Sequence, residues 1–168
     1  AAIREDIEAI QSIYSYYVLN GLASFEITPP DENEMLARWR LVRDLGHPYL
    51  VAEFNDTLAG FSYASTFRKR PAYDHTLENA VYVSPEYLEK GIGVCLLNKL
   101  IEECIHLGFR QMIAVIGDSN NHPSLSLHTK CGFERVGLLP STGFKHGRWV
   151  DTVLMQRSIG DGDKTPPS

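Results

Sequence analysis

Val81-Tyr82-Val83-Ser84-Pro85 is followed by a short polar loop, by Gly91-Ile92-Gly93, and then by an apolar run with helical spacing. This pattern predicts a strand that runs into a glycine turn, which in turn opens a helix. Backbone N–H groups at a helix start, with no side chain in front of them, form a site for a phosphate or pyrophosphate. A Gly-x-Gly sequence alone is more typical of an ordinary tight turn, so the rest of the chain has to decide between the two.

The spacing of this turn excludes two familiar phosphate-binding loops. A Walker loop needs Lys and then Ser or Thr after its last glycine, whereas Gly93 is followed by Val94-Cys95. A dinucleotide-binding fingerprint needs a third glycine at position 96, which is a leucine here. It also needs an acidic residue at the end of the next strand, which closes with Val115-Ile116.

Composition narrows the class of protein. The 168 residues suffice for one domain with a buried core, and 43% hydrophobic with 22% charged residues is typical of a globular protein. The net charge of −5 disfavours broad binding to nucleic acid. Three cysteines without a close pairing motif favour thiols in a reducing compartment, and no membrane span or signal peptide is visible. We therefore expect a cytoplasmic protein with no nucleic-acid and no membrane partner.

Periodicity and turn residues predict the order of the secondary structure. Helices are expected near 4–18 and 31–45, from the glycine turn to Gly108, and from Pro123 to Gly132. Strands are expected at Tyr49–Phe54, Leu58–Thr66, Leu77–Val83, Gln111–Ile116, Phe133–Leu138 and Trp149–Gln156, with a loop at Pro140–Arg148. The fold class is α/β, an α/β sandwich with a mixed central sheet. One domain is expected over 1–158, with its first strand partly truncated, and 159–168 is expected to be a flexible tail.

The order of these features is specific. An acidic strand start, Gly-x-Gly, a helix, a strand, an Asn/Ser turn and a short helix follow one another. Over nearly its whole length the chain resembles the GNAT superfamily of acyl-CoA-dependent N-acetyltransferases, and within it the phosphinothricin acetyltransferases and their methionine sulfoximine relatives. The stretches that carry the resemblance are Tyr73-Asp74, Glu78, Val81–Pro85, Gly91–Gly93, Ala114–Gly117, Leu127-His128, Gly132-Phe133 and Gly143–Gly147 with Trp149 and Asp151. The last of these is more diagnostic of the subfamily than the glycine turn.

The resemblance implies a GNAT-type mixed sheet that is splayed at the cofactor site, with acetyl-CoA as cosubstrate and no metal. The implied cofactor-binding residues are Val81, Tyr82, Val83, Glu89, Lys90, Gly91, Ile92, Gly93, Val94, Cys95, Asn121 and Ser124. One position departs from the superfamily, because Leu88 stands where Gln or Arg usually opens the loop. Two of these residues have plainer readings: Asn121 as a helix cap, and Cys95 as a small packing residue.

Two side chains are candidates for catalysis. Alternation along a strand puts Glu78, Ala80 and Tyr82 on one face. Amide formation requires loss of a proton from the ammonium, stabilisation of an oxyanion and protonation of the leaving thiolate. Glu78 can serve as the base, and backbone N–H groups near Tyr82–Ser84 can bind the oxyanion. His128 stands where the superfamily often has Tyr, and either a general-acid role or a cofactor contact remains open. Without the resemblance, a solvated Glu78 and a satisfied helix histidine are the more common situations.

The basic run Arg68–Arg70 is by default a solvated loop, but Phe67 and Tyr73 beside it favour a pocket. An amino acid that bears a phosphinate or sulfone needs a cation and an apolar wall. The candidate substrate-binding residues are Phe25, Arg70, Tyr73 and Tyr82, with Arg70 gripping the anionic group. Phe25 and Phe144 are as typical of a core as of a substrate wall.

The leading function is acetyl transfer from acetyl-CoA to the α-amine of a small amino-acid-like molecule such as phosphinothricin, methionine sulfoximine or methionine sulfone. The resemblance ties such an activity to detoxification and herbicide resistance. Alternative acceptors are a peptide N-terminus, a polyamine or an ordinary amino acid. A different class is a catalytically silent CoA-binding regulatory module, against which Glu78 and His128 argue. A homodimer is expected, since Trp149 and the aromatic loop Gly143–His146 would be partly exposed on one chain.

Overall fold

The computed structural model describes residues 1–167. Its six strands form one sheet in the order β1-β2-β3-β4-β6-β5. The strands are β1 (Tyr49–Phe54), β2 (Thr57–Thr66), β3 (Thr76–Val83), β4 (Gln111–Gly117), β5 (Glu134–Lys145) and β6 (Arg148–Ser158). The helices are α1 (Ile7–Asn20), α2 (Glu32–Asp44), α3 (Ile92–His106) and α4 (His122–Lys130), with 3₁₀ turns at Arg4–Asp6, Pro71–Tyr73 and Pro85–Tyr87. The expected α/β class with a mixed sheet is confirmed.

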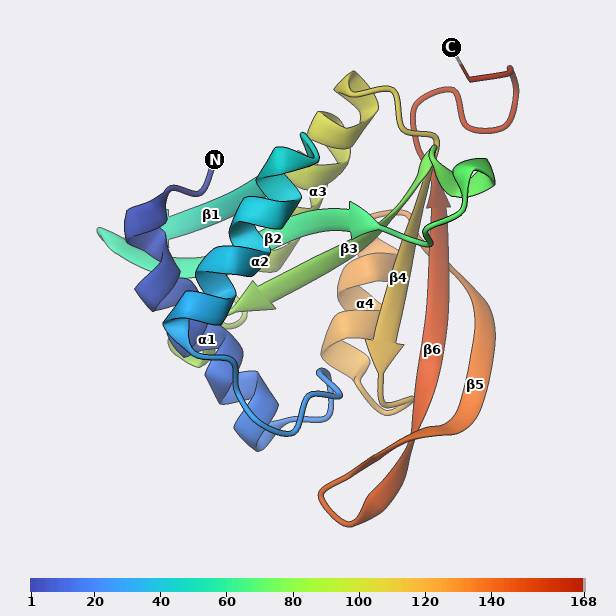
Figure 1. Ribbon diagram of the computed structural model, residues 1–168. Coiled ribbons are helices and arrows are strands. Elements are labelled where there is room, and N and C mark those ends of the chain that lie inside the picture. The colour runs from blue at the N-terminus through green and yellow to red at the C-terminus, as the bar shows by residue number, and fades with distance from the viewer. Residues whose placement is uncertain (168) are drawn as a thin grey trace.

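Helices cover the sheet in two layers (Figure 1). Helices α1 and α2 pack on one face of β1–β3, where Trp39 and Phe61 belong to the buried cluster. Helices α3 and α4 lie on the other face over a core that includes Leu97, Leu100 and Met112. Burial of one apolar stripe per helix supplies the main driving force for this arrangement. In α3 that stripe comes from the apolar run with helical spacing, of which Ile92, Leu96, Leu100 and Cys104 are all buried.

Local signals place several element ends. Asp31 caps α2, because its carboxylate accepts the Glu34 N–H at 2.8 Å. Asn55 and Asp56 have φ of 50° and 59°, the left-handed pair that a two-residue hairpin between β1 and β2 requires. The turn residues between the two expected strands therefore form a hairpin, which sets β2 beside β1.

The sheet is opened between β3 and β4. These two strands are parallel, and their paired residues run only from Thr76–Gln111 to Glu78–Ile113. Beyond Glu78 the strands diverge, and Figure 1 shows β3 and β4 starting side by side and separating toward their ends. The other neighbour of β3 is β2, which stays paired with it as far as Val83. The expected splay in the sheet lies at this point.

The loop expected at Pro140–Arg148 is wrong for most of its length. Strands β5 and β6 continue through it as a long hairpin that projects from the sheet in Figure 1. The reversal takes place at His146 and Gly147, which have φ of 51° and 72°. A register shift between Leu139 and Gly143 accommodates Pro140, because an irregular pairing removes the need for its missing N–H.

The C-terminal segment also differs from its expected boundary. Ile159 is 1% exposed and belongs to the core rather than to a tail. The Arg110 guanidinium donates hydrogen bonds to Gly162 O and Thr165 Oγ1, both at 3.1 Å. The last residue of the expected tail, position 168, lies outside the described residues. Within 1–167, the helices are too short or too polar for any of them to cross a membrane.

Candidate functional site

A cavity of about 140 Å³ passes through the sheet where β3 and β4 separate, and we call it the slot. Its lining comes from four elements, β2, β3, β4 and α4, and from two loop residues. The lining residues are Ala23, Tyr63, Glu78, Asn79, Ala80, Val81, Tyr82, Ala114, Val115, Ile116, Gly117, Asn121, Ser124 and His128. Glu78 and Tyr82 reach it from the face of α1 and α2, whereas His128 reaches it from α4 on the other face. The structure thus brings both catalytic candidates to one cavity.

Glu78 is the last residue of β3 that pairs with β4, and its side chain is half-buried. Burial raises the pKa of its carboxyl group above the usual value, and the Arg68 guanidinium partly opposes that shift. A carboxyl group in such a position titrates closer to neutral pH, which suits a general base. Tyr63 of β2 also lines the slot. The sequence analysis missed it, because the alternation of residues along β2 does not show that this strand pairs with β3.

Aromatic rings form the wall of the slot below Glu78. The Tyr82 ring meets Tyr14 edge-on at 5.2 Å between centroids and lies 5.3 Å from Phe61. Tyr17 is 5.5 Å from the same ring and donates its hydroxyl to Val83 O. Tyr82 therefore lines the slot as part of an aromatic cluster to which α1 contributes Tyr14 and Tyr17.

His128 is 4% exposed, and each ring nitrogen faces a protein oxygen. Nε2 lies 2.9 Å from Asn79 Oδ1, and Nδ1 lies 2.8 Å from Ser124 O. Burial lowers the pKa of the imidazole, with the Ser124 carbonyl acting against that shift. Asn79 was not among the predicted site residues, although a polar residue between the apolar Leu77 and Val81 was a signal for it.

Phe25 sits over the end of the slot from the loop between α1 and α2. An added methyl group at Gly117 would come within 2.8 Å of the Phe25 ring, and one at Gly143 within 2.5 Å. The ring is therefore seated between two glycines, one on β4 and one on β5. Phe25 is 38% exposed, so one side of it remains available to a ligand.

Polar contacts hold this loop, residues 21–31, in place. The Lys145 ammonium, 3% exposed on β5, donates to Ser24 O at 2.7 Å. Tyr14 bonds Ser24 Oγ at 3.0 Å and also Glu26. Glu26 pairs with the Arg38 guanidinium at 2.8 Å, which lowers the pKa of the carboxyl group. Lys145 belongs to the stretch that marks the subfamily, and its contact supplies a physical reason for a lysine there.

The glycine turn has the backbone shape of an anion site. Glu89 and Gly91 have φ of 60° and 76°, so the chain curls before α3 begins at Ile92. The Cys95 N–H bonds Gly91 O at 3.0 Å, which leaves the N–H groups of the first three helical residues without a helical acceptor. These donors fit a pyrophosphate.

Gly93 has a further role in packing. A methyl group there would lie 3.4 Å from both terminal carbons of Leu127, so glycine lets α3 approach α4 closely. Gly91, by contrast, has open space around its absent side chain and needs glycine for its φ. Leu88 is 52% exposed, and Lys90 lies 5.4 Å from the Phe54 ring. Cys95 is exposed, which contradicts its reading as a packing residue.

Besides Phe25, which lies at the end of the slot, two other substrate-binding candidates are outside the slot lining. Arg70 and Tyr73 belong to the loop between β2 and β3, where Arg70 is exposed and Tyr73 packs edge-on against Phe67 at 5.5 Å. The nearby guanidinium whose charge acts on Glu78 is that of Arg68. Sequence could not separate these two arginines, because both stand in one basic run.

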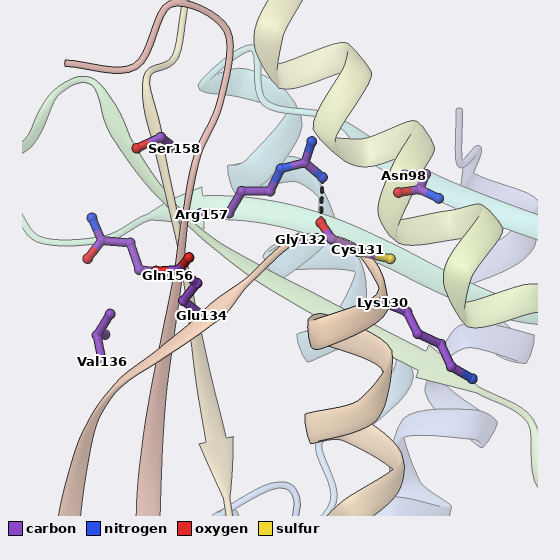
Figure 2. Close-up of a pocket in the computed structure, with 9 residues that line it drawn as sticks. All are labelled: Asn98, Lys130, Cys131, Gly132, Glu134, Val136, Gln156, Arg157 and Ser158. Atoms are coloured by element: carbon purple, nitrogen blue, oxygen red, sulfur yellow. Dashed lines mark hydrogen bonds between the residues drawn. The ribbon is translucent and has the colours of Figure 1, made fainter. Parts of the chain in front are cut away.

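A larger hollow of about 680 Å³ lies elsewhere, between α3, the end of α4 and strands β5 and β6 (Figure 2). None of the predicted site residues lines it. Figure 2 shows the Arg157 side chain pointing from β6 to the carbonyl oxygen of Cys131, to which it donates a hydrogen bond. This contact caps the C-terminal end of α4 and so helps to hold the helix that carries His128. Among residues 1–167, no cluster of His, Cys, Asp or Glu is arranged to hold a metal ion.

Comparison with known proteins places this geometry among acetyltransferases. Residues 10–133 match the acetyltransferase (GNAT) family. A phosphinothricin N-acetyltransferase from Alcaligenes faecalis is 51% identical over 163 residues, which cover 97% of this chain and 83% of that protein. An L-methionine sulfoximine/L-methionine sulfone acetyltransferase from Salmonella typhimurium strain LT2 is 34% identical, with 95% and 93% covered.

A solved structure is similar over almost the whole chain. It is a GNAT superfamily phosphinothricin acetyltransferase from Sinorhizobium meliloti in complex with acetyl-CoA. The TM-score is 0.96 and the sequence identity is 48%, with 99% of this chain and 90% of that chain covered.

Proposed function

The chain belongs to the GNAT family of acetyltransferases, and from this premise we propose that it acetylates the α-amine of a small amino-acid-like molecule that carries an acidic group. One observation carries the proposal: Glu78, with a raised pKa, lies at the point where the sheet opens into a slot. The similar phosphinothricin and methionine sulfoximine acetyltransferases support this choice of acceptor.

Acetyl-CoA is the proposed donor and supplies an acetyl group activated as a thioester. The N–H groups at the start of α3 and the loop Glu89–Cys95 would hold its pyrophosphate. Asn121 and Ser124, at the start of α4, line the slot together with Val81 and Tyr82, and Val83 lies next to Gly93 of the turn. These residues would contact the part of the cofactor between the pyrophosphate and the thioester. Because backbone donors do most of this work, Leu88 in place of a polar residue leaves the site usable.

Glu78 would accept a proton from the substrate ammonium, directly or through a water molecule. The freed amine nitrogen then bonds to the thioester carbonyl carbon, and the carbon–sulfur bond breaks with its electron pair on sulfur. Of the two protons that the nitrogen gives up, one passes through Glu78 to solvent and the other ends on the thiol. Backbone N–H groups of β3 beyond Glu78, where the pairing with β4 has ended, would stabilise the negative carbonyl oxygen.

The loop between β2 and β3 would bind the acidic group of the substrate. Arg68 and Arg70 both offer a guanidinium that can grip a carboxylate or phosphinate with two parallel hydrogen bonds. Arg70 remains our candidate for this contact, with Tyr73 beside it. Arg68 has a second role as the cation that acts on Glu78. Phe25 and Tyr82 would supply the apolar walls.

A panel of amines tests the function. Thiol release from acetyl-CoA is measured with phosphinothricin, methionine sulfoximine, methionine sulfone, ordinary amino acids, a polyamine and a peptide, and mass spectrometry locates the added acetyl group. We expect the first three to give the highest kcat/KM. Thiol release with none of the amines, despite acetyl-CoA binding, would instead indicate a silent regulatory module.

We also propose a homodimer. Exposed apolar residues gather on the β5–β6 hairpin, where Trp149 is 64% and Phe144 57% exposed and the two rings pack edge-on at 5.2 Å. A second copy of the chain would cover this surface. Light scattering at micromolar concentration should give the mass of two chains, and the mass of one chain would contradict the proposal. Replacement of Trp149 by Glu should halve the measured mass.

The cytoplasm is the proposed compartment. Cys95, Cys104 and Cys131 are all free thiols, which fits a reducing environment. Location of a tagged chain in cell fractions tests this directly.

A further inference from the structure

The Asn79 side chain stands where the pairing of β3 with β4 stops. The last paired residues are Glu78 and Ile113, and the side chain of the next residue of β3 reaches across to β4. Asn79 Nδ2 donates to Ile113 O at 3.2 Å. Asn79 is 7% exposed, so this buried amide group adds a side-chain contact between β3 and β4 at the last rung of their pairing.

His128 fixes the other end of the same amide group. Asn79 Oδ1 lies 2.9 Å from His128 Nε2, across 49 positions of the sequence. The imidazole packs edge-on against Phe133 at 5.1 Å, and α4 itself is capped by Asn121 at its start and by Arg157 at its end. A continuous set of contacts therefore joins β4, β3 and α4 at the opening of the slot.

The chemistry of the contacts assigns the proton on His128. Asn79 uses its nitrogen on Ile113 O, so the atom that faces Nε2 is an oxygen that only accepts. Ser124 O, beside Nδ1, is a helical carbonyl and also accepts the backbone N–H four residues on. Both ring nitrogens therefore face acceptors, and the 2.9 Å contact to Asn79 Oδ1 requires that Nε2 carry a proton and donate it.

We propose that Asn79 and His128 act together as a strut that sets the width of the slot, and that His128 serves acetyl transfer by holding Asn79 rather than by protonating the leaving thiolate. The proposal rests on the acetyltransferase function proposed above. Both residues are then positioning residues: transfer of the Nε2 proton to a thiolate would leave Asn79 Oδ1 buried without a donor.

Substitutions at position 128 distinguish a histidine that holds Asn79 from one that protonates the leaving thiolate. Gln places an amide N–H where Nε2 was, whereas Asn reaches only the region of Nδ1, and neither can act as a proton donor like imidazole. We expect His128→Gln to keep kcat/KM within about tenfold of the wild type, and His128→Asn and His128→Phe to lose roughly a hundredfold, the scale of a small misplacement of reacting groups. Equal losses in all three variants would overturn the proposal.

A double-mutant cycle provides the second test. Asn79→Leu removes both contacts of the amide, so adding His128→Phe should then cost little more. A further large loss on adding His128→Phe would show that the histidine acts without Asn79 and would overturn the proposal. Thermal melting of each variant checks that it is folded.

Calorimetry of acetyl-CoA binding completes the test, because it does not depend on turnover. Asn79→Leu should weaken binding by about tenfold or more if the strut sets the slot, and His128→Gln should leave the Kd close to that of the wild type. Unchanged binding in Asn79→Leu would refute the strut. A wild-type protein that binds acetyl-CoA but acetylates no amine would instead refute the proposed function, and the binding comparison would still stand.

Discussion

The glycine turn before α3 and the slot between β3 and β4 are neighbours along the chain but are built in opposite ways. The turn consists of consecutive residues whose backbone angles, φ of 60° at Glu89 and 76° at Gly91, create its donors. The slot is assembled from side chains on β2, β3, β4 and α4. The turn is therefore sensitive to backbone substitutions at single positions, whereas the slot is sensitive to contacts that cross the fold.

The largest effect is expected in the slot. Glu78→Gln keeps the shape of the side chain but removes the base, so kcat should fall by about 10²-fold or more. The Kd for acetyl-CoA, measured by calorimetry, should hardly change, because the turn is intact. A turnover near that of the wild type across a pH series would show that Glu78 is not the base.

A substitution in the glycine turn should instead change the affinity for acetyl-CoA. Gly91→Val places a branched side chain at φ 76°, which costs about 1–3 kcal/mol if the loop keeps its shape. The loop is expected to relax, and binding of acetyl-CoA must restore it, so the Kd should rise roughly 5- to 150-fold. Calorimetry checks this. Gly46→Val is the matched control, because Gly46 has φ 73° and open space but lies after α2. An equal loss of affinity in both variants would refute the assignment of the turn.

The packing of the Phe25 ring against Gly143 shows how far the slot depends on a strand that does not line it. Gly143→Ala pushes a methyl group into the Phe25 ring, an overpacking that costs typically about 1–3 kcal/mol. The loop 21–31 should shift, and KM for the amine should rise by about tenfold. Gly137→Ala on the same strand is the control, since its methyl group meets Leu154 at an ordinary 3.6 Å. Steady-state kinetics with unchanged KM in Gly143→Ala would contradict a substrate wall at Phe25.

The smallest effect concerns the charge near Glu78. The raised pKa of Glu78 means that kcat/KM should rise with pH through an acid limb above the usual glutamate range, because the base must lose its proton. Arg68 lowers that pKa, so Arg68→Gln should move the limb to higher pH. Arg70→Gln should leave the position of the limb unchanged even if it raises KM. A pH profile with equal shifts in both variants would show that the two arginines act alike.

Sequence alone determined most of the elements. The apolar stripe of α3 and the strands on either side of Asn55-Asp56 follow from the sequence, because each depends on residues a few positions apart. It failed at Pro140–Arg148, where proline and polar residues indicate a loop. Pairing with β6 keeps most of that segment in a strand, and a register shift accommodates the proline.

Sequence also named Glu78 and His128, but only the tertiary structure decided what surrounds them. Asn79 and His128 are 49 positions apart, and Ser24 and Lys145 are 121 apart, so no local pattern links either pair. Periodicity and backbone propensity act over a few residues, and they fix which face of an element is apolar and where it ends. The hydrogen-bond partner of a buried polar group depends instead on which elements the whole chain brings together, and for this slot that was settled by the divergence of β3 and β4 over α4.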